Sequence, residues 1–133
     1  MKGNYNLLMK LKNRIIILIF TFILFASPCF AIKIGLQTHV GRTHVGASTK
    51  AEVIDCKTNK LIFVMEKMKA YELKPYHDSI VIKVDGDFRK IKTNAIIIKP
   101  EPNGFVSVKR KWYRGNFKIT NDGLGLTVIN DLP

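Results

Sequence analysis

Residues 105–128 read FVSVKRKWYRGNFKITNDGLGLTV and carry the clearest strand pattern of the chain. Apolar residues alternate with polar ones at a period of two in 105–108, 116–120 and 124–128, which is typical of β-strands with one buried face. The Asn-Asp-Gly sequence at 121–123 separates two of these segments and favours a tight turn. This part of the chain therefore predicts consecutive antiparallel strands.

The same pattern extends toward the N-terminus. Further strands are predicted at 32–36, 51–54, 61–65, 80–84 and 95–98. Turn-forming residues separate them at 55–60, 85–87 and 100–104. Residues 65–74 fit both helical and strand spacing, and strand is preferred there. Strands every eight to twelve residues indicate an all-β domain, with a small antiparallel sheet or a sandwich-like arrangement.

The length and charge of the chain limit the classes of protein it can be. It has 133 residues with 22 Lys and Arg against 10 Asp and Glu, a formal net charge of +12. A chain of this length holds one small domain, so a large two-domain enzyme is excluded.

Residues 1–31 predict an export signal. Four cations and no acid occupy the first 14 residues, and residues 15–26 read IIILIFTFILFA without a charge. Pro28 ends the apolar run, and the small residues Cys29 and Ala31 place signal-peptidase cleavage after Ala31. An uncleaved membrane anchor is the alternative, because residues 15–32 are free of charge and long enough to span a bilayer. A lipoprotein modified at Cys29 is disfavoured because Pro28 precedes that cysteine.

The part predicted to leave the cytoplasm is the β-domain of residues 32–133. Removing the four cations of the signal from the 22 leaves 18 basic and 10 acidic side chains, a net charge of +8. Cys56 is its single cysteine, so no internal disulfide can form and the fold depends on an apolar core. A buried, unreactive thiol is preferred for Cys56 over a reactive one.

The chain lacks the residue patterns of known catalytic and metal sites. His39, His44 and His77 are not accompanied by other ligands at zinc-site spacing, so we expect them on loops or the surface. The acids are scattered without an evident acid and base pair, and no nucleotide-binding or serine-hydrolase motif occurs. The sequence therefore predicts no catalytic residue, no metal and no cofactor.

The densest candidate binding cluster consists of four cations interleaved with two aromatic residues: Lys109, Arg110, Lys111, Trp112, Tyr113 and Arg114. Such a set can stack on sugar rings or bases while its cations hold an anion. The alternative is a strand whose aromatic residue points into the core and whose charges are only solvated. Export disfavours nucleic acid as the partner. An envelope polymer rich in carboxylate or phosphate, such as peptidoglycan or teichoic acid, is expected instead.

At this cluster the chain resembles a known family. Residues 112–117, 121–124 and 126–133 read WYRGNF, NDGL and LTVINDLP. They are similar to the N-terminal region of the SpoIID/LytB family, which contains stage II sporulation protein D and the amidase enhancer LytB. Residues 32–36 look like the first strand of that family, and residues 96–104 like the strand and turn before its Tyr-Arg-Gly.

The resemblance implies a role in peptidoglycan remodelling at the cell envelope, in sporulation and engulfment or in amidase enhancement. The same resemblance implies an N-acetylmuramoyl-L-alanine amidase as a partner. No position matches the family's catalytic glutamate, which lies beyond the segment where this chain ends, so binding or positioning is expected rather than catalysis.

Two alternatives stay open. The chain is a fragment of a peptidoglycan lytic transglycosylase, or it is a structural, partner-binding envelope domain. The last strand would leave an open sheet edge at the C-terminus unless a following segment covers it, so we expect the domain to be truncated before the catalytic segment.

Overall fold

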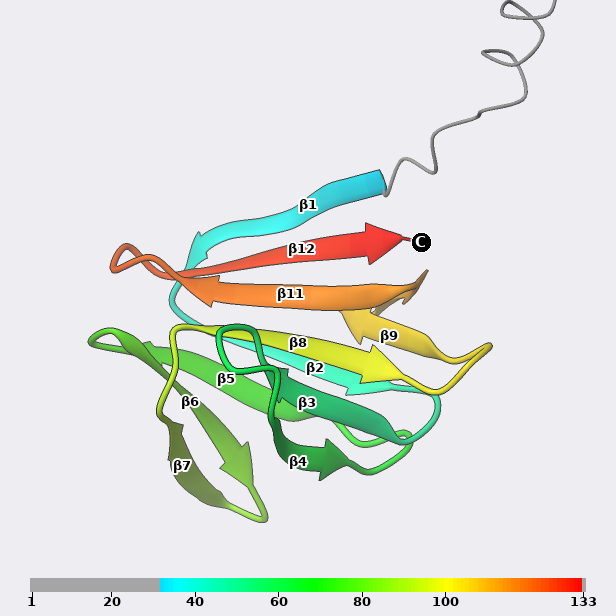
Figure 1. Cartoon of the computed structure of the whole chain (residues 1–133), viewed down its shortest axis with the longest axis horizontal. Helices are drawn as coiled ribbons and strands as arrows, with labels where there is room; N and C mark the ends of the chain where they lie inside the picture. Colours follow the sequence, from blue (N-terminus) through cyan, green and yellow to red (C-terminus); the bar gives the residue numbers. More distant parts are fainter. Residues whose placement is uncertain (1–31, 133) are drawn as a thin grey trace, which may run out of the picture. The chain divides into compact units, whose positions relative to one another are not determined.

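The computed structural model describes residues 32–132, which form twelve β-strands and no helix (Figure 1). This confirms the all-β class. Within the described part of the chain there is consequently no helix that could cross a membrane. The predicted export signal, or anchor, lies outside the described residues.

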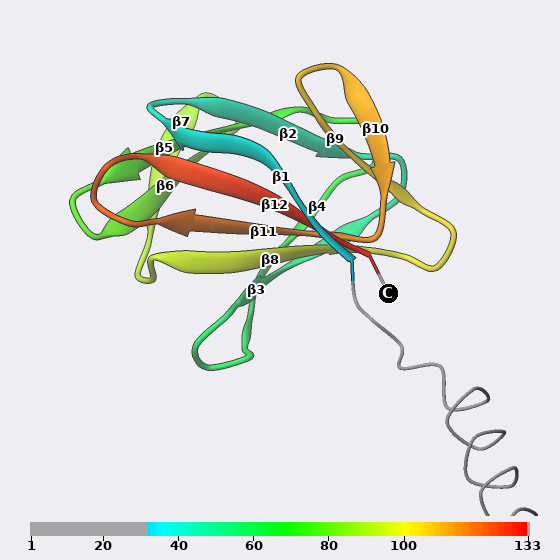
Figure 2. The same ribbon diagram turned by 90° about the horizontal axis from the view of Figure 1, so that it is seen from above.

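The strands form two six-stranded antiparallel sheets. Sheet A contains, in spatial order, β1 (Ile32–Val40), β12 (Leu126–Leu132), β11 (Asn116–Asn121), β8 (Ala95–Pro100), β3 (Ala51–Asp55) and β4 (Leu61–Met65). Sheet B contains β10 (Lys111–Arg114), β9 (Phe105–Val108), β2 (Thr43–Ala47), β5 (Tyr71–Tyr76), β6 (Ser79–Val84) and β7 (Asp87–Ile91). Figure 2 shows the two sheets as separate layers, with the chain passing between them several times.

The core lies between the inner faces of the two sheets. Because side chains alternate along a strand, every second residue of each central strand points inward. Sheet A contributes Ile96, Ile98, Phe117, Ile119 and Val128, and sheet B contributes Val45, Leu73, Ile80, Val106 and Val108. All are at most 2% exposed. Residues 32–132 thus bury a complete core of their own and form one folding unit.

Two strands were missed by the sequence analysis. In β2 only Thr43, Val45 and Ala47 point inward, and His44 with Gly46 made this segment look like a loop. In β7 only Ile91 is buried, because β7 is the outer strand of sheet B. An edge strand with one core residue, such as β7, carries too little apolar periodicity to be recognised.

The expectation of an open edge at the last strand was wrong. β12 lies between β11 and β1, and its end is covered because Leu132 pairs with Ile32. The covering strand is β1, from the opposite end of the folded unit. The sequence of the last residues alone does not contain this long-range pairing. The edges of sheet A are β1 and β4.

A sharp corner at Gly115 carries the chain from β10 in sheet B to β11 in sheet A. Gly115 has a φ of +90°, and a Cβ atom there would lie 2.5 Å from the backbone oxygen of Asp131. The side-chain amide of Asn130 donates hydrogen bonds to the carbonyl oxygens of Arg114 (2.8 Å) and Asn116 (3.3 Å), on either side of the glycine. Asn130 is 1% exposed, so this corner is fixed inside the protein.

A second buried asparagine joins the sheets at the other end of β11. The side-chain amide of Asn121 donates to the carbonyl oxygens of His77 (2.9 Å) and Ser79 (2.7 Å), which belong to the β5–β6 turn of sheet B. Its side-chain oxygen accepts a hydrogen bond from the backbone N–H of Gly123 (3.0 Å). Asn121 therefore satisfies polar groups of both sheets and fixes their separation at this end.

Replacing Gly115 by Ala should destabilise the protein much more than the same change at Gly86. Both glycines have nearly equal positive φ values, but nothing lies within 4 Å of a Cβ atom built at Gly86. Gly86→Ala therefore reports the backbone strain alone, about 1–2 kcal/mol. Gly115→Ala adds the clash with Asp131, for a total of about 3 kcal/mol or more. Urea unfolding measures both values, and equal losses would show that the corner tolerates a side chain.

Asn121→Asp should destabilise the protein by about 2–4 kcal/mol at neutral pH, because a carboxylate cannot donate to two buried carbonyl groups. Asn59→Asp is the matched control, since Asn59 is an exposed turn residue. The free energy of unfolding of each variant gives the comparison. A loss at position 121 no larger than at position 59 would contradict the proposed role of the amide.

Candidate functional site

A groove on the outer face of sheet B contains part of the predicted binding cluster. It consists of two adjoining hollows, of about 520 and 170 Å³, that both touch Ala70 and Ser107. We call it the Trp112 groove. Its principal lining residues are Arg42, His44, Gly46, Met68, Lys69, Ala70, Ser107, Lys109, Arg110 and Trp112.

Small residues meet on neighbouring strands at the floor of the groove. Ser107 of β9 pairs with Gly46 of β2 on one side and with Trp112 of β10 on the other. A Cβ atom at Gly46 would come within 3.1 Å of the Ser107 hydroxyl oxygen. The side chain of Trp112 is 49% exposed and stands beside this low floor. About half of the surface of Trp112 is thus available to a ligand.

The β9–β10 turn places two cations at the rim of the groove. Lys109 and Arg110 are the two residues of this turn, because Val108 pairs with Lys111. Their φ values are +51° and +61°. Positive φ at both positions is the type I′ geometry, which normally uses Asn and Gly. Here two long cationic residues adopt it, although they are strained in this conformation.

The other cations near the groove are paired to different degrees. Arg42 forms an ion pair with Glu72, with 2.8 Å between its Nε and the carboxylate. The Lys69 ammonium lies 2.8 Å from the carboxylate of Asp85. This hydrogen bond raises the pKa of Lys69 and lowers the pKa of Asp85, so both groups are charged at neutral pH. A ligand would therefore meet Lys109 and Arg110 as the cations most available to it.

The structure separates the remaining cluster residues. Tyr113 points inward and packs against the core, with its ring centroid 5.9 Å from that of Phe117. Arg114 points outward, and its guanidinium lies 5.7 Å from the Phe105 ring centroid. It lines a different hollow of about 400 Å³, next to the Gly115 corner. Lys111 is exposed and lines none of these hollows. Strand alternation thus sends neighbours in sequence to different surroundings.

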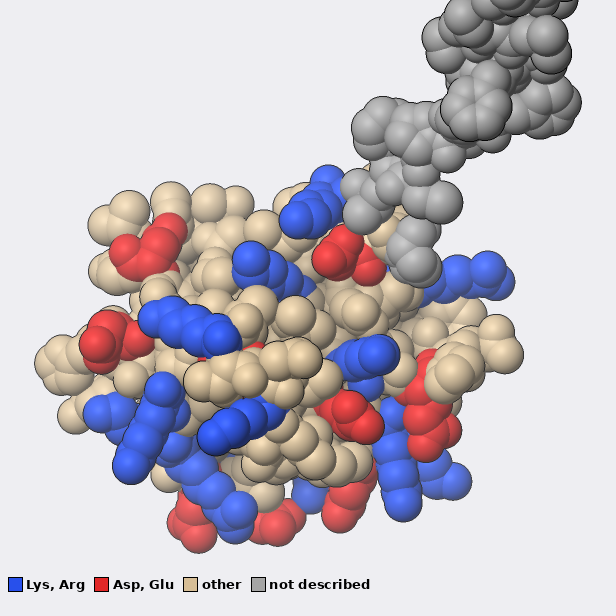
Figure 3. All heavy atoms as spheres, viewed as in Figure 1, with Lys and Arg blue, Asp and Glu red and all other residues tan. Residues whose placement is uncertain are grey.

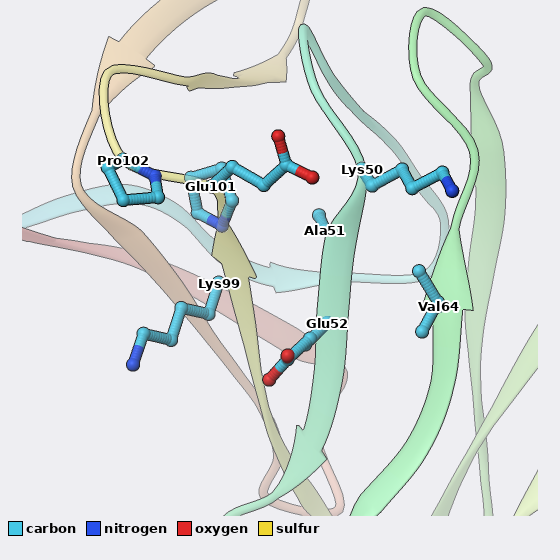
Figure 4. Close-up of a pocket in the computed structure, with 8 residues that line it drawn as sticks. Lys50, Ala51, Glu52, Val64, Lys99, Glu101 and Pro102 are labelled. Carbon is cyan, nitrogen blue, oxygen red and sulfur yellow. The ribbon is translucent and has the colours of Figure 1, made fainter.

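A hollow of about 320 Å³ on sheet A is less suited to an anion (Figure 4). Its charged residues are Lys50, Glu52, Lys99 and Glu101, so two carboxylates offset two cations. No aromatic residue lines it. On the face seen in Figure 3, where β8, β11 and β12 lie in front, cationic and acidic side chains are interspersed.

The three histidines and Cys56 lie at separate places in the structure. His39 hydrogen-bonds to Asp122 through its Nε2 atom, at 2.7 Å, whereas His44 lines the Trp112 groove. His77 lies in the β5–β6 turn, and Cys56 is half-buried after β3. Within residues 32–132 no three His, Cys, Asp or Glu side chains come together as a metal site.

No family model, curated protein or solved structure matches this chain. The resemblance to the SpoIID/LytB family stays a prediction. The residues that carry it have clear structural roles, since Gly115 and Asn130 form the corner between the sheets.

Sequence reasoning found Trp112, Lys109 and Arg110 but missed Arg42, His44 and Gly46. These three belong to β2 or its approach, and β2 was not recognised as a strand. The alternation of Val45 and Ala47 with His44 and Gly46 was the available signal.

The double change Lys109→Asn, Arg110→Gly should stabilise the protein by about 1–2 kcal/mol, because the new residues favour positive φ. Urea unfolding measures the gain. Lys57→Gln with Lys60→Gln is the control, as it removes the same charge from exposed positions without positive φ. An equal gain in the control would assign the effect to charge and not to turn strain.

Proposed function

We propose that residues 32–132 form a non-catalytic binding module that holds an anionic polymer of the cell envelope in the Trp112 groove. One observation carries this proposal: a half-exposed Trp112 lines one of two adjoining hollows, and Lys109 and Arg110 line the other.

The chemistry of the groove suits a sugar that bears a negative charge. An indole face stacks on the apolar face of a sugar ring, as it does on other flat or cationic groups. A guanidinium binds carboxylate or phosphate through two parallel hydrogen bonds. A hollow of about 170 Å³, lined by Ser107 and Ala70, adjoins Trp112 and can receive part of a sugar ring. Peptidoglycan and teichoic acids both combine sugars or polyols with anionic groups.

The export signal predicted in residues 1–31 supports an envelope location, where such polymers occur. The resemblance to the SpoIID/LytB family supports a role in peptidoglycan remodelling, with an N-acetylmuramoyl-L-alanine amidase as a further possible partner. If the chain is a piece of a lytic transglycosylase, the same groove would hold the glycan strand for an active part outside it.

A second candidate function is binding of a protein partner by strand addition. It is favoured by β4, an edge strand of sheet A whose Leu61, Ile62 and Val64 are 55%, 36% and 46% exposed. An open apolar edge can pair with a strand of another chain. Concentration-dependent association in analytical ultracentrifugation, abolished by Ile62→Lys, would favour this candidate.

The proposed function is tested by co-sedimentation of residues 32–133 with purified peptidoglycan sacculi. Trp112→Ala with Arg110→Gln should reduce retention at least fivefold, because both the stacking surface and a rim cation are lost. Both residues are exposed, so circular dichroism should show an unchanged fold.

Lys57→Gln with Lys60→Gln is the control for net charge and should change retention little. Sacculi stripped of teichoic acid by mild acid distinguish the two polymers. Equal retention of wild type and the Trp112→Ala, Arg110→Gln variant would remove the groove from this role.

A further inference from the structure

The outer face of sheet B continues past the groove onto β5, β6 and β7. On this face Lys74 of β5, Val81 of β6 and Lys90 of β7 lie opposite one another, and Lys83 lies opposite Phe88. We call the set Lys74, Tyr76, Lys83, Phe88 and Lys90 the β5–β7 face. None of its members belongs to the binding cluster predicted from the sequence.

Lysines and aromatic rings alternate on the β5–β7 face. Phe88 is 45% exposed, and the ammonium groups of Lys74 and Lys83 lie 4.6 and 5.5 Å from its ring centroid. Tyr76 is 50% exposed, with the Lys90 ammonium 5.6 Å from its centroid. Within residues 32–132 neither Lys83 nor Lys90 has a carboxylate within 4.0 Å. The rings thus hold two lysines without neutralising their charge.

The charge of the face is continuous with that of the groove. Glu72 lies between the two regions, and its Oε1 atom is 2.8 Å from Arg42 and 3.8 Å from Lys74. Two cations thus offset this one carboxylate. Arg42 lines the groove and Lys74 belongs to the β5–β7 face, so Glu72 joins the two cationic regions and does not separate them.

The dimensions of the sheet indicate the size of the ligand. Trp112 is on β10 and Phe88 on β7, the two edges of the six-stranded sheet. Neighbouring strands lie about 4.8 Å apart, so the two edges are about 24 Å apart. A single sugar or phosphate group cannot span this distance. A chain with repeated anionic groups can, because cations recur along the whole width.

We propose that the Trp112 groove and the β5–β7 face form one track that binds a linear phosphodiester polymer of the teichoic acid type across the strands of sheet B. This inference rests on the proposed function and specifies its ligand. Lysine ammoniums act as point charges without the fork geometry that selects a carboxylate. Several lysines on one face therefore fit a flexible polymer with one charge per repeat. An anionic membrane fits less well, because Asp85 and Asp87 occupy the tip of the β6–β7 hairpin.

The inference is tested by titrating residues 32–133 with poly(glycerol phosphate) and with glycerol phosphate, using Trp112 fluorescence and calorimetry. The polymer should bind and the monomer should not at equal phosphate concentration. Lys83→Gln with Lys90→Gln should weaken polymer binding about tenfold at low salt. The plot of log K against log salt should become less steep. The magnitude of its negative slope should decrease by roughly 1.4, about 0.7 for each lost phosphate contact.

Lys57→Gln with Lys60→Gln removes the same charge on sheet A and should leave both affinity and slope near wild-type values. The inference is overturned if the Lys83→Gln, Lys90→Gln variant binds like this control while Trp112→Ala with Arg110→Gln still weakens binding. The proposed function then survives without the extended track. If neither variant differs from the control, the inference fails, and the sacculus assay decides the proposed function separately. Binding of phosphatidylglycerol vesicles without binding of the polymer would also overturn the inference and identify a membrane surface.

Discussion

The architecture depends on one constraint, the passage of the chain from sheet B to sheet A at Gly115. At that point the backbone must turn with a positive φ directly against the backbone of Asp131, which leaves no room for a side chain. Asn130 fixes the turn by donating to the carbonyl groups on both sides of it. Once the corner is set, β10 is held at the edge of sheet B and β11 at the centre of sheet A.

The corner also determines which residues of the cationic cluster reach solvent. Because β10 pairs with β9 in a fixed register, Tyr113 faces the core while Trp112 and Arg114 face outward. The two-residue turn before β10 then brings Lys109 and Arg110 to the rim of the groove. The strain of two consecutive residues at positive φ is consistent with a functional demand for cations at that turn, since strained backbone concentrates at functional sites.

The resemblance to the SpoIID/LytB family rests on residues that the structure uses for folding. Gly115 and Asn130 form the corner, and Asn121 ties the end of β11 to the β5–β6 turn. Such residues are informative about architecture, because few side chains satisfy two buried carbonyl groups. These residues say less about which ligand the protein binds. The binding that we propose would use Trp112, Lys109, Arg110 and the lysines of β5–β7, of which only the first three belong to the cationic cluster recognised in the sequence.

The sequence by itself determined the all-β class, most of the strands and the cluster that carries Trp112, because alternating apolar residues and turn-forming residues act locally. It did not reveal β7, which has a single inward residue, or β2, in which His44 and Gly46 obscured the alternation. It also could not place β1 beside β12 or bring Lys74, Lys83 and Lys90 onto one surface. Those relations join residues far apart in the chain. Only the pairing of strands in the tertiary structure decides them, because the register of each pair fixes which side chains share a face.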